Sequence, residues 1–248
     1  MIHRHWFGVA GASGQVPIVL LHEGLGSISA WGRFPQALAD ATGRPVLAYD
    51  RLGYGRSGPH PGPWPTDFMH NEARLLAHLL SEEGIGRAIL AGHSDGATIA
   101  LLYPSQCGPG AASVAGIVSL SAHALVEDVT VEAIRELRRT YPDGLRPRLR
   151  GHHDDADALF AAWSEVWLSH RFRRWTIGDE LEAVRCPVIA IQGDNDTYGT
   201  GRQLAALVAG VSGTITAHEL PGVDHWPHRE ATDQVLELIS AYCGRLPN

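Results

Sequence analysis

The feature that most constrains the fold is a series of short, mainly apolar runs separated by stretches of helical periodicity. The runs cover residues 16–21, 45–49, 87–91, 116–120, 187–191 and 214–220. An unbroken apolar run of this length is typical of a strand that is covered on both faces. Strands that alternate with helices at this spacing predict an α/β fold, in which a doubly wound and mainly parallel sheet carries helices on both sides.

The segments between the runs predict the helices. Helical patterns cover residues 29–42, 66–83, 98–103, 130–141, 154–170 and 229–242. The alternation breaks between residues 122 and 184, where two predicted helices have no buried strand between them. We therefore expect a core of residues 1–121 and 185–248, with residues 122–184 as a helical lid over one edge of the sheet. Residues 1–14 predict a short strand that ends in a glycine-rich turn.

Composition limits the classes of function. The chain has 248 residues, enough for one large domain with a real core, and a net charge of −7 with no basic block. That charge argues against nucleic-acid binding. No apolar run approaches the ~18 residues of a membrane span, so we expect no membrane partner. The three widely spaced cysteines Cys107, Cys186 and Cys243 indicate reduced thiols and a cytoplasmic protein.

The stretch Gly92-His93-Ser94-Asp95-Gly96 lies between a predicted strand and a predicted helix. In that context Gly-x-Ser-x-Gly indicates a nucleophile elbow, a turn so tight that the serine adopts strained backbone dihedrals. The two glycines are needed because strand and helix nearly touch there. An ordinary turn of small residues can show the same pattern, so the interpretation needs partners elsewhere in the chain.

A serine hydroxyl needs a base within hydrogen-bond reach, and that base needs a third group to orient it. The base candidate is His225, because it follows the last predicted strand in a loop that can reach the sheet edge. His228 and His218 are alternatives. The acid candidates are Asp196 and Asp194, which directly follow a buried strand and could instead cap a turn. The carboxyl ends of parallel strands meet at one edge of such a sheet, where active sites lie.

Acyl transfer also needs two hydrogen-bond donors for the developing oxyanion. The N–H of Asp95, at the start of a predicted helix, is one candidate. The loop at residues 22–26 offers the second, most simply the N–H of Gly24, with that of Leu25 as the alternative. The glycines of this loop let the backbone approach a ligand closely, although a plain strand-to-helix turn would look the same.

Five segments together resemble the α/β-hydrolase superfamily, in particular its lid-bearing serine hydrolases and esterases. They are Leu-His-Glu-Gly-Leu-Gly at 21–26, Asp-Arg-Leu-Gly-Tyr-Gly-Arg-Ser at 50–57, Gly-His-Ser-Asp-Gly at 92–96, Gly-Asp-Asn-Asp at 193–196 and Gly-Val-Asp-His at 222–225. Their order and their spread along the chain make the resemblance specific. It implies a catalytic triad of Ser94, His225 and Asp196, and a helical lid inserted after the sixth-strand position.

The chain departs from that family in three places. Glu23 stands where a glycine is usual, which puts a carboxylate beside the oxyanion loop; it could select substrates, face solvent or pair with Arg51. Asp95 follows the nucleophile where an uncharged residue is commoner. The segment before residue 16 is too short for the usual antiparallel edge strands, so the sheet could lack one strand or more there.

The resemblance implies a cofactor-free enzyme that cleaves a carboxylic ester or related acyl bond of a small or medium substrate. The same triad on this fold also serves carbon–carbon bond hydrolysis of a diketone-like substrate, thioester hydrolysis and perhydrolysis. A non-catalytic ligand receptor on this scaffold is a further alternative. As a partner we expect a small-molecule substrate, and a homodimer is compatible with the sequence.

Aromatic side chains of the predicted lid could line an apolar pocket or could pack the lid onto the core. They are Phe160, Trp163, Trp167, Phe172 and Trp175. We expect Trp163 and Trp167 at the substrate, together with Glu23 and Leu25 from the oxyanion loop. The run His-His-Asp-Asp at residues 152–155 indicates a polar turn, and we expect no metal there.

Overall fold

The computed structural model describes residues 1–8, 14–60 and 62–247. Within them, seven strands form one sheet in the order β1-β3-β2-β4-β5-β6-β7. The strands are β1 Arg4–Phe7, β2 Ile18–Leu21, β3 Val46–Tyr49, β4 Arg87–His93, β5 Ser113–Leu120, β6 Val188–Gly193 and β7 Ile215–Leu220. β1 runs antiparallel to β3, and every other neighbouring pair is parallel. The predicted mainly parallel α/β sheet is confirmed.

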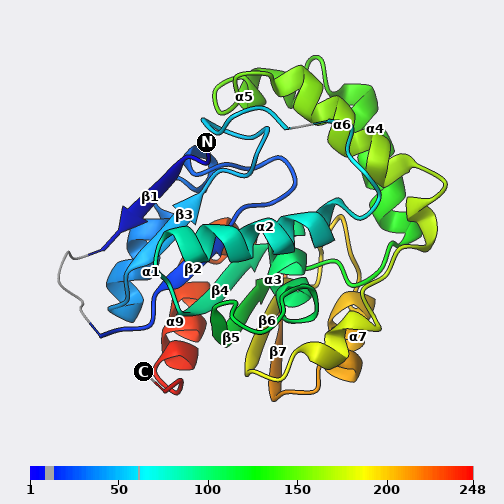
Figure 1. Cartoon of the computed structure of the whole chain (residues 1–248). Coiled ribbons are helices and arrows are strands. Elements are labelled where there is room, and N and C mark those ends of the chain that lie inside the picture. The colour runs from blue at the N-terminus through cyan, green and yellow to red at the C-terminus, as the bar shows by residue number, and fades with distance from the viewer. Residues whose placement is uncertain (9–13, 61, 248) are drawn as a thin grey trace.

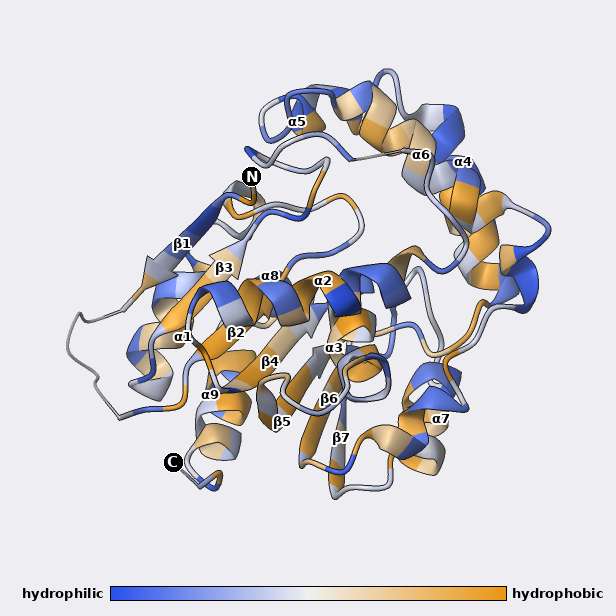
Figure 2. Ribbon diagram, viewed as in Figure 1, coloured by the Kyte–Doolittle hydropathy of each residue, from blue (hydrophilic) through white to orange (hydrophobic). Residues whose placement is uncertain are grey.

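Helices cover both faces of this sheet (Figure 1). On one face α1, Phe34–Thr42, packs beside α9, Thr232–Cys243. On the other face lie α2 Phe68–Glu82, α3 Asp95–Gln106 and α7 Arg202–Gly210. The central strands are therefore mainly apolar, as the orange stretches of Figure 2 show, and β2 and β3 are buried at every position. Continuous apolar runs arise because neither face of these strands meets water.

Between β5 and β6 the chain forms a series of helices, which we call the β5–β6 helical segment (residues 121–187). They are α4 Asp128–Thr140, α5 Arg146–Leu149, α6 Ala156–Leu168 and the 3-10 helices η2 Phe172–Arg174 and η3 Glu180–Ala183. α4, α5 and α6 lie beyond the carboxyl ends of the parallel strands (Figure 1). Within the described residues one antiparallel strand, β1, occupies the β3 edge, and this segment follows the fifth of the seven described strands.

Two of the predicted helices are wrong in detail. The single helix expected over residues 29–42 is a 3-10 turn, η1 Ser29–Trp31, followed by a reversal at Gly32 with φ 60° before α1. Glycine favours that left-handed conformation. The closing helix expected over residues 229–242 is likewise broken, at Ala231, into α8 Pro227–Glu230 and α9. The strand predicted near the N-terminus is β1, whereas the turn at 9–13 lies outside the described residues.

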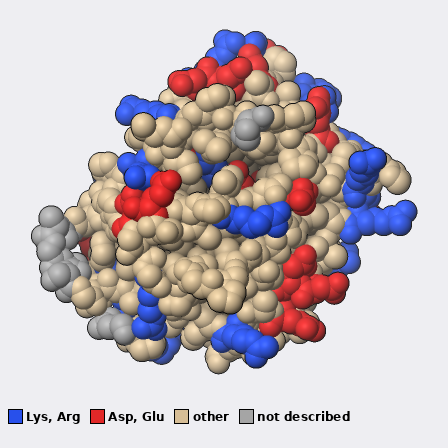
Figure 3. Space-filling view, viewed as in Figure 1, with Lys and Arg blue, Asp and Glu red and all other residues tan. Residues whose placement is uncertain are grey.

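The charged surface is mixed in sign. On the face drawn in Figure 3, basic and acidic side chains are interspersed rather than gathered into one block. Among the described residues, no helix is both long and apolar enough to cross a membrane.

Candidate active site

Ser94 sits in the tight turn between β4 and α3, with φ 52° and ψ −121°. Non-glycine residues rarely adopt this conformation, and strain of this kind is common at functional sites. A Cβ on Gly96 would overlap the carbonyl oxygen of Leu21, and a Cβ on Gly92 would overlap the backbone of Gly96. The close approach of strand and helix thus requires both glycines, and it holds the Ser94 side chain at the carboxyl end of β4.

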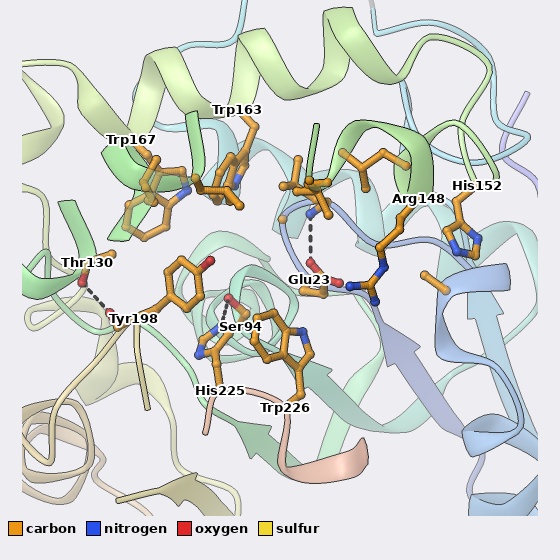
Figure 4. A pocket seen from close by; sticks show the side chains of 18 of the residues that line it. Glu23, Ser94, Thr130, Arg148, His152, Trp163, Trp167, Tyr198, His225 and Trp226 are labelled. Carbon is orange, nitrogen blue, oxygen red and sulfur yellow. Dashed lines mark hydrogen bonds between the residues drawn. The ribbon is translucent and has the colours of Figure 1, made fainter. Parts of the chain in front are cut away.

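The imidazole of His225 connects Ser94 to Asp196. Its Nε2 lies 3.0 Å from Ser94 Oγ (Figure 4). Its Nδ1 lies 2.8 Å from Oδ1 of Asp196. All three side chains are buried, although 131 positions separate Ser94 from His225 in the chain. The Asp196 carboxylate favours the proton on Nδ1 of His225, which leaves the lone pair of Nε2 facing the hydroxyl.

Backbone donors hold Asp196 in its ionised form. Its Oδ1 accepts the N–H of Tyr198 at 2.8 Å and that of Gly199 at 3.1 Å. Burial opposes the charge, but the hydrogen bond and charge of His225, together with the backbone donors, hold the pKa of Asp196 below its ordinary value. A carboxylate in this position can stabilise a positive charge on His225.

The alternative acid and bases lie in other environments. Asp194 Oδ1 accepts the N–H of Gly222 at 2.7 Å and so joins the loop after β6 to the loop after β7. His228 is buried with its ring against Trp31, at a centroid distance of 4.8 Å. His218 lies within β7. The structure therefore places His225 and Asp196 at Ser94. Asp194, His228 and His218 make other contacts.

Two side chains from the loop after β3 fix the direction of the oxyanion loop. Arg51 donates to the carbonyl oxygen of His22 at 2.5 Å and to that of Glu23 at 2.9 Å. The hydroxyl of Tyr54 donates to the carbonyl oxygen of Gly24 at 3.1 Å. A carbonyl and the N–H that follows it point in opposite directions across a trans peptide. The N–H of Gly24 consequently points away from Arg51.

Glu23 turns its carboxylate back onto this same loop. Its Oε2 accepts the N–H of Leu25 at 3.1 Å (Figure 4). The alternative in which this carboxylate pairs with Arg51 is wrong, because Arg51 binds the backbone carbonyl of Glu23 instead. Since the Leu25 N–H is engaged, Gly24 and the first turn of α3, at Asp95, remain as sources of oxyanion donors.

Asp95 is a buried carboxyl group at the start of α3. Burial raises its pKa to about 6, while the charge of Arg51 and a hydrogen bond from Trp163 favour the ionised form. Nε1 of Trp163 lies 3.2 Å from Oδ2 of Asp95. The guanidinium of Arg51 also lies 4.5 Å above the ring of Tyr54. The oxyanion loop is thus packed against a buried cation and a buried carboxyl.

A cavity of about 540 Å³ opens above Ser94, between the sheet edge and the β5–β6 helical segment (Figure 4). Its volume is typical of small-molecule sites. The apolar lining comprises Leu25, Ile134, Leu137, Leu145, Leu149, Trp163 and Trp167. The charged lining comprises Glu23, Arg148, Arg229 and Glu230. The cavity can therefore accept a largely apolar molecule that carries a few polar groups.

The five aromatic residues singled out in the sequence divide into two groups. Trp163 and Trp167 line the cavity, as Figure 4 shows. For the other three the packing alternative describes the structure, since Phe160 is buried in the hydrophobic core and Phe172 stacks on Trp175 with ring centroids 4.9 Å apart. These three pack the helical segment onto the core.

Sequence reasoning missed two residues that contact His225. The ring of His123 lies 5.6 Å from that of His225, and the ring of Tyr198 lies 4.8 Å from it. Both line the cavity, and burial lowers the pKa of His123 to about 3, so its imidazole is neutral. The position of each residue in the sequence could have indicated it, because His123 follows the end of β5 and Tyr198 lies two residues beyond Asp196.

Known proteins resemble this chain in sequence. The profile described as "Alpha/beta hydrolase family" matches residues 18–238. The sn-1-specific diacylglycerol lipase ABHD11 of Danio rerio is 36% identical over 91 residues, which are 37% of this chain and 27% of that protein. Serine hydrolase BPHL of Homo sapiens is 27% identical over 210 residues, 79% of this chain and 68% of that protein. The matched segment thus spans only about a quarter of the lipase.

Solved structures resemble it in fold. The enol-lactonase from Burkholderia xenovorans superposes with a TM-score of 0.76 at 18% identity, covering 98% of this chain and 96% of that one. At that identity the likeness concerns the fold alone. The family profile covers most of the sequence, and the relatives it matches include lipases and hydrolases. The chain therefore belongs to the alpha/beta hydrolase family.

Proposed function

We propose that this hydrolase cleaves carboxylic esters through a covalent acyl-enzyme, with Ser94, His225 and Asp196 as its catalytic triad. The observation that carries the proposal is the continuous chain of contacts from Asp196 Oδ1 to His225 Nδ1, and from His225 Nε2 to Ser94 Oγ, at 2.8 and 3.0 Å. The stability of the fold gives no reason for a strained serine beside a cavity to be connected in this way to a histidine and an aspartate.

In the first half-reaction Ser94 Oγ attacks the ester carbonyl while Nε2 of His225 takes the hydroxyl proton. Asp196 keeps the imidazole in the required tautomer and stabilises its positive charge. His225 then returns the proton to the leaving alcohol, and the acyl group remains on Ser94. In the second half-reaction a water molecule, deprotonated by His225, attacks the acyl-enzyme. The bond from the acyl carbon to Ser94 Oγ then breaks, His225 returns the proton to Oγ, and the acid is released.

The N–H groups of Gly24 and Asp95 hold the oxyanion in both half-reactions. The direction set by the bond from Arg51 to the Glu23 carbonyl supports this role for Gly24, and the helix start supports it for Asp95. Fixed backbone donors of this kind contribute more than mobile ones, because they need no reorganisation as the charge develops.

The substrate binds in the cavity above Ser94, with its apolar part against Trp163 and Trp167. Residues 122–184 act as the lid of a core formed by residues 1–121 and 185–248, because they supply most of the apolar wall. The relatives in sequence include a diacylglycerol lipase, which supports an ester bond over a carbon–carbon bond. The volume of about 540 Å³ favours a small or medium ester.

A fluorophosphonate probe tests the nucleophile. We expect the wild-type chain to form a covalent adduct at Ser94 and to hydrolyse p-nitrophenyl esters, and we expect Ser94→Ala to do neither while keeping the wild-type thermal stability. Adduct formation at another residue, or undiminished ester hydrolysis by Ser94→Ala, would refute the proposal. A screen of ester, thioester and diketone substrates with Ser94→Ala as the blank then identifies the bond.

A further inference from the structure

One hydrogen bond joins the β5–β6 helical segment to the nucleophile elbow. Nε1 of Trp163, in α6, lies 3.2 Å from Oδ2 of Asp95, at a separation of 68 positions in the chain. Trp163 is 7% exposed and Asp95 is 1% exposed. Asp95 directly follows Ser94, and its backbone N–H is one of the two proposed oxyanion donors. A side chain of the helical segment is thus bonded to a residue that presents such a donor.

Gly24, the source of the other donor, packs against the same hydrogen bond. A Cβ on Gly24 would overlap Nε1 of Trp163 and would lie 2.7 Å from Oδ2 of Asp95. The Cα of Gly24 therefore rests against both partners, and a residue with a side chain would have to displace one of them. Any shift of the Trp163 indole would change the space available to Gly24.

The opposite side of the oxyanion loop is already fixed by Arg51 and Tyr54, which bind its carbonyl oxygens. The loop thus lies between these donors on one side and the bond from Trp163 to Asp95 on the other. A displacement of about 1 Å at an active site can cost about 100-fold in rate. Removing one side of this support is therefore expected to affect the chemical step.

We propose that Trp163 is a positioning residue whose indole N–H, through Asp95 and Gly24, keeps both oxyanion donors directed at one point. This inference rests on the proposed function. It gives the helical segment a part in the chemical step as well as in forming the cavity wall. An apolar wall would need only an aromatic ring, whereas the N–H serves the carboxylate of Asp95.

The environment of Asp95 supports this role. A buried carboxylate is costly unless donors or cations surround it. Burial and the neighbouring charge of Glu23 raise the pKa of Asp95, while Arg51 and the Trp163 N–H oppose them. Trp163 is consequently one of the groups that keep Asp95 charged and fixed at neutral pH.

The test compares Trp163→Phe with Trp167→Phe in the full chain. Both variants lose an indole N–H and the same volume from one cavity wall, but Nε1 of Trp167 has no hydrogen-bond partner among the described residues. We expect Trp163→Phe to lower kcat about 10- to 100-fold, with a change in KM no larger than that of Trp167→Phe. Trp167→Phe should act mainly on KM. A trifluoromethyl ketone, whose adduct carries an oxyanion, should lose affinity for Trp163→Phe by the factor seen in kcat.

Asp95 variants give an independent measurement if Trp163→Phe folds poorly. Asp95→Ala removes the acceptor but keeps the backbone N–H, so its kcat should fall, and the Trp163→Phe/Asp95→Ala double variant should fall no further. Asp95→Asn keeps an acceptor oxygen and should retain most of the kcat. Equal kcat losses in the two tryptophan variants, or additive losses in the double variant, would overturn the inference and leave the proposed function intact. If the wild-type chain neither hydrolyses esters nor binds the ketone, both this inference and the proposed function are refuted.

Discussion

The guanidinium of Arg51 donates to the backbone carbonyl of Glu23 at 2.9 Å, and this bond sets the direction of the peptide that carries the Gly24 N–H. Arg51 is buried and lies on the ring of Tyr54, which binds the next carbonyl. A planar guanidinium can bind two carbonyl oxygens while it stacks on an aromatic ring, and an ammonium cannot. The loop therefore depends on arginine rather than on positive charge alone.

Arg51→Lys should lower both activity and stability. A lysine keeps the charge but leaves at least one buried carbonyl without its donor, so we expect kcat/KM for a p-nitrophenyl ester to fall about 10- to 100-fold. The free energy of unfolding in urea should fall by about 2 kcal/mol. Arg56→Lys, at an exposed position of the same loop, should change the unfolding free energy by less than about 0.5 kcal/mol. Similar results for the two variants would contradict this role for Arg51.

The assignment of the acid predicts different behaviour for two neighbouring aspartates. Asp196→Asn would disturb the tautomer of His225, so kcat should fall by about 1,000- to 10,000-fold with little change in KM. Asp194 binds the N–H of Gly222 instead. An asparagine side chain would keep an acceptor oxygen for that bond, so Asp194→Asn should retain kcat near the wild-type value. Steady-state kinetics on one ester test this assignment. A larger kcat loss in Asp194→Asn than in Asp196→Asn would identify Asp194 as the acid.

Most of the sheet could be predicted because its central strands are covered on both faces, which leaves mainly apolar runs in the sequence. The same rule places functional side chains at strand ends, and Ser94, Asp196 and His225 all lie there. Helix breaks at Gly32 and Ala231 were missed, because a helical pattern of apolar residues continues across them. The spacing of apolar residues indicates which face of a segment is buried. It does not indicate whether the helix is interrupted between two of those residues.

Contacts between distant segments leave no local pattern at all. The bond between Trp163 and Asp95 crosses 68 positions, and neither residue indicates the other. Glu23 could be recognised as unusual from the sequence, but the acceptor for Arg51 could not, because it is a backbone carbonyl. The direction of a carbonyl depends on the loop conformation rather than on the residue type.

The buried carboxyl of Asp95 predicts a pH-dependent effect on stability. Its pKa in the folded chain, about 6, lies above the ordinary value of 3.8, so the folded state binds this proton more tightly than the unfolded state does. Ionisation above pH 6 thus costs folding free energy, up to about 3 kcal/mol, and the cost disappears below about pH 4. We expect Asp95→Asn to raise the unfolding free energy at pH 7.5 and to leave it nearly unchanged at pH 4.

Urea unfolding of the wild type and of Asp95→Asn at both pH values measures this difference. Ionisable groups common to both proteins cancel in the comparison, unless the substitution itself shifts them. A stabilisation of equal size at both pH values would show that the charge of Asp95 is not its source. The result bears on function, because a carboxylate retained at such a cost next to Ser94 is expected to serve the site.

The carboxylate of Glu23 predicts selection by charge. It lines the cavity next to Gly24, where negative charge develops during the reaction, so an anionic substrate should be disfavoured. Glu23→Gln keeps an acceptor for the Leu25 N–H and should raise kcat/KM for the p-nitrophenyl hemisuccinate about 10-fold relative to the neutral butyrate ester. Arg148→Gln, which removes a cation from the same cavity, should shift that ratio the opposite way. An unchanged ratio in Glu23→Gln would mean that this carboxylate acts only on the loop that it binds.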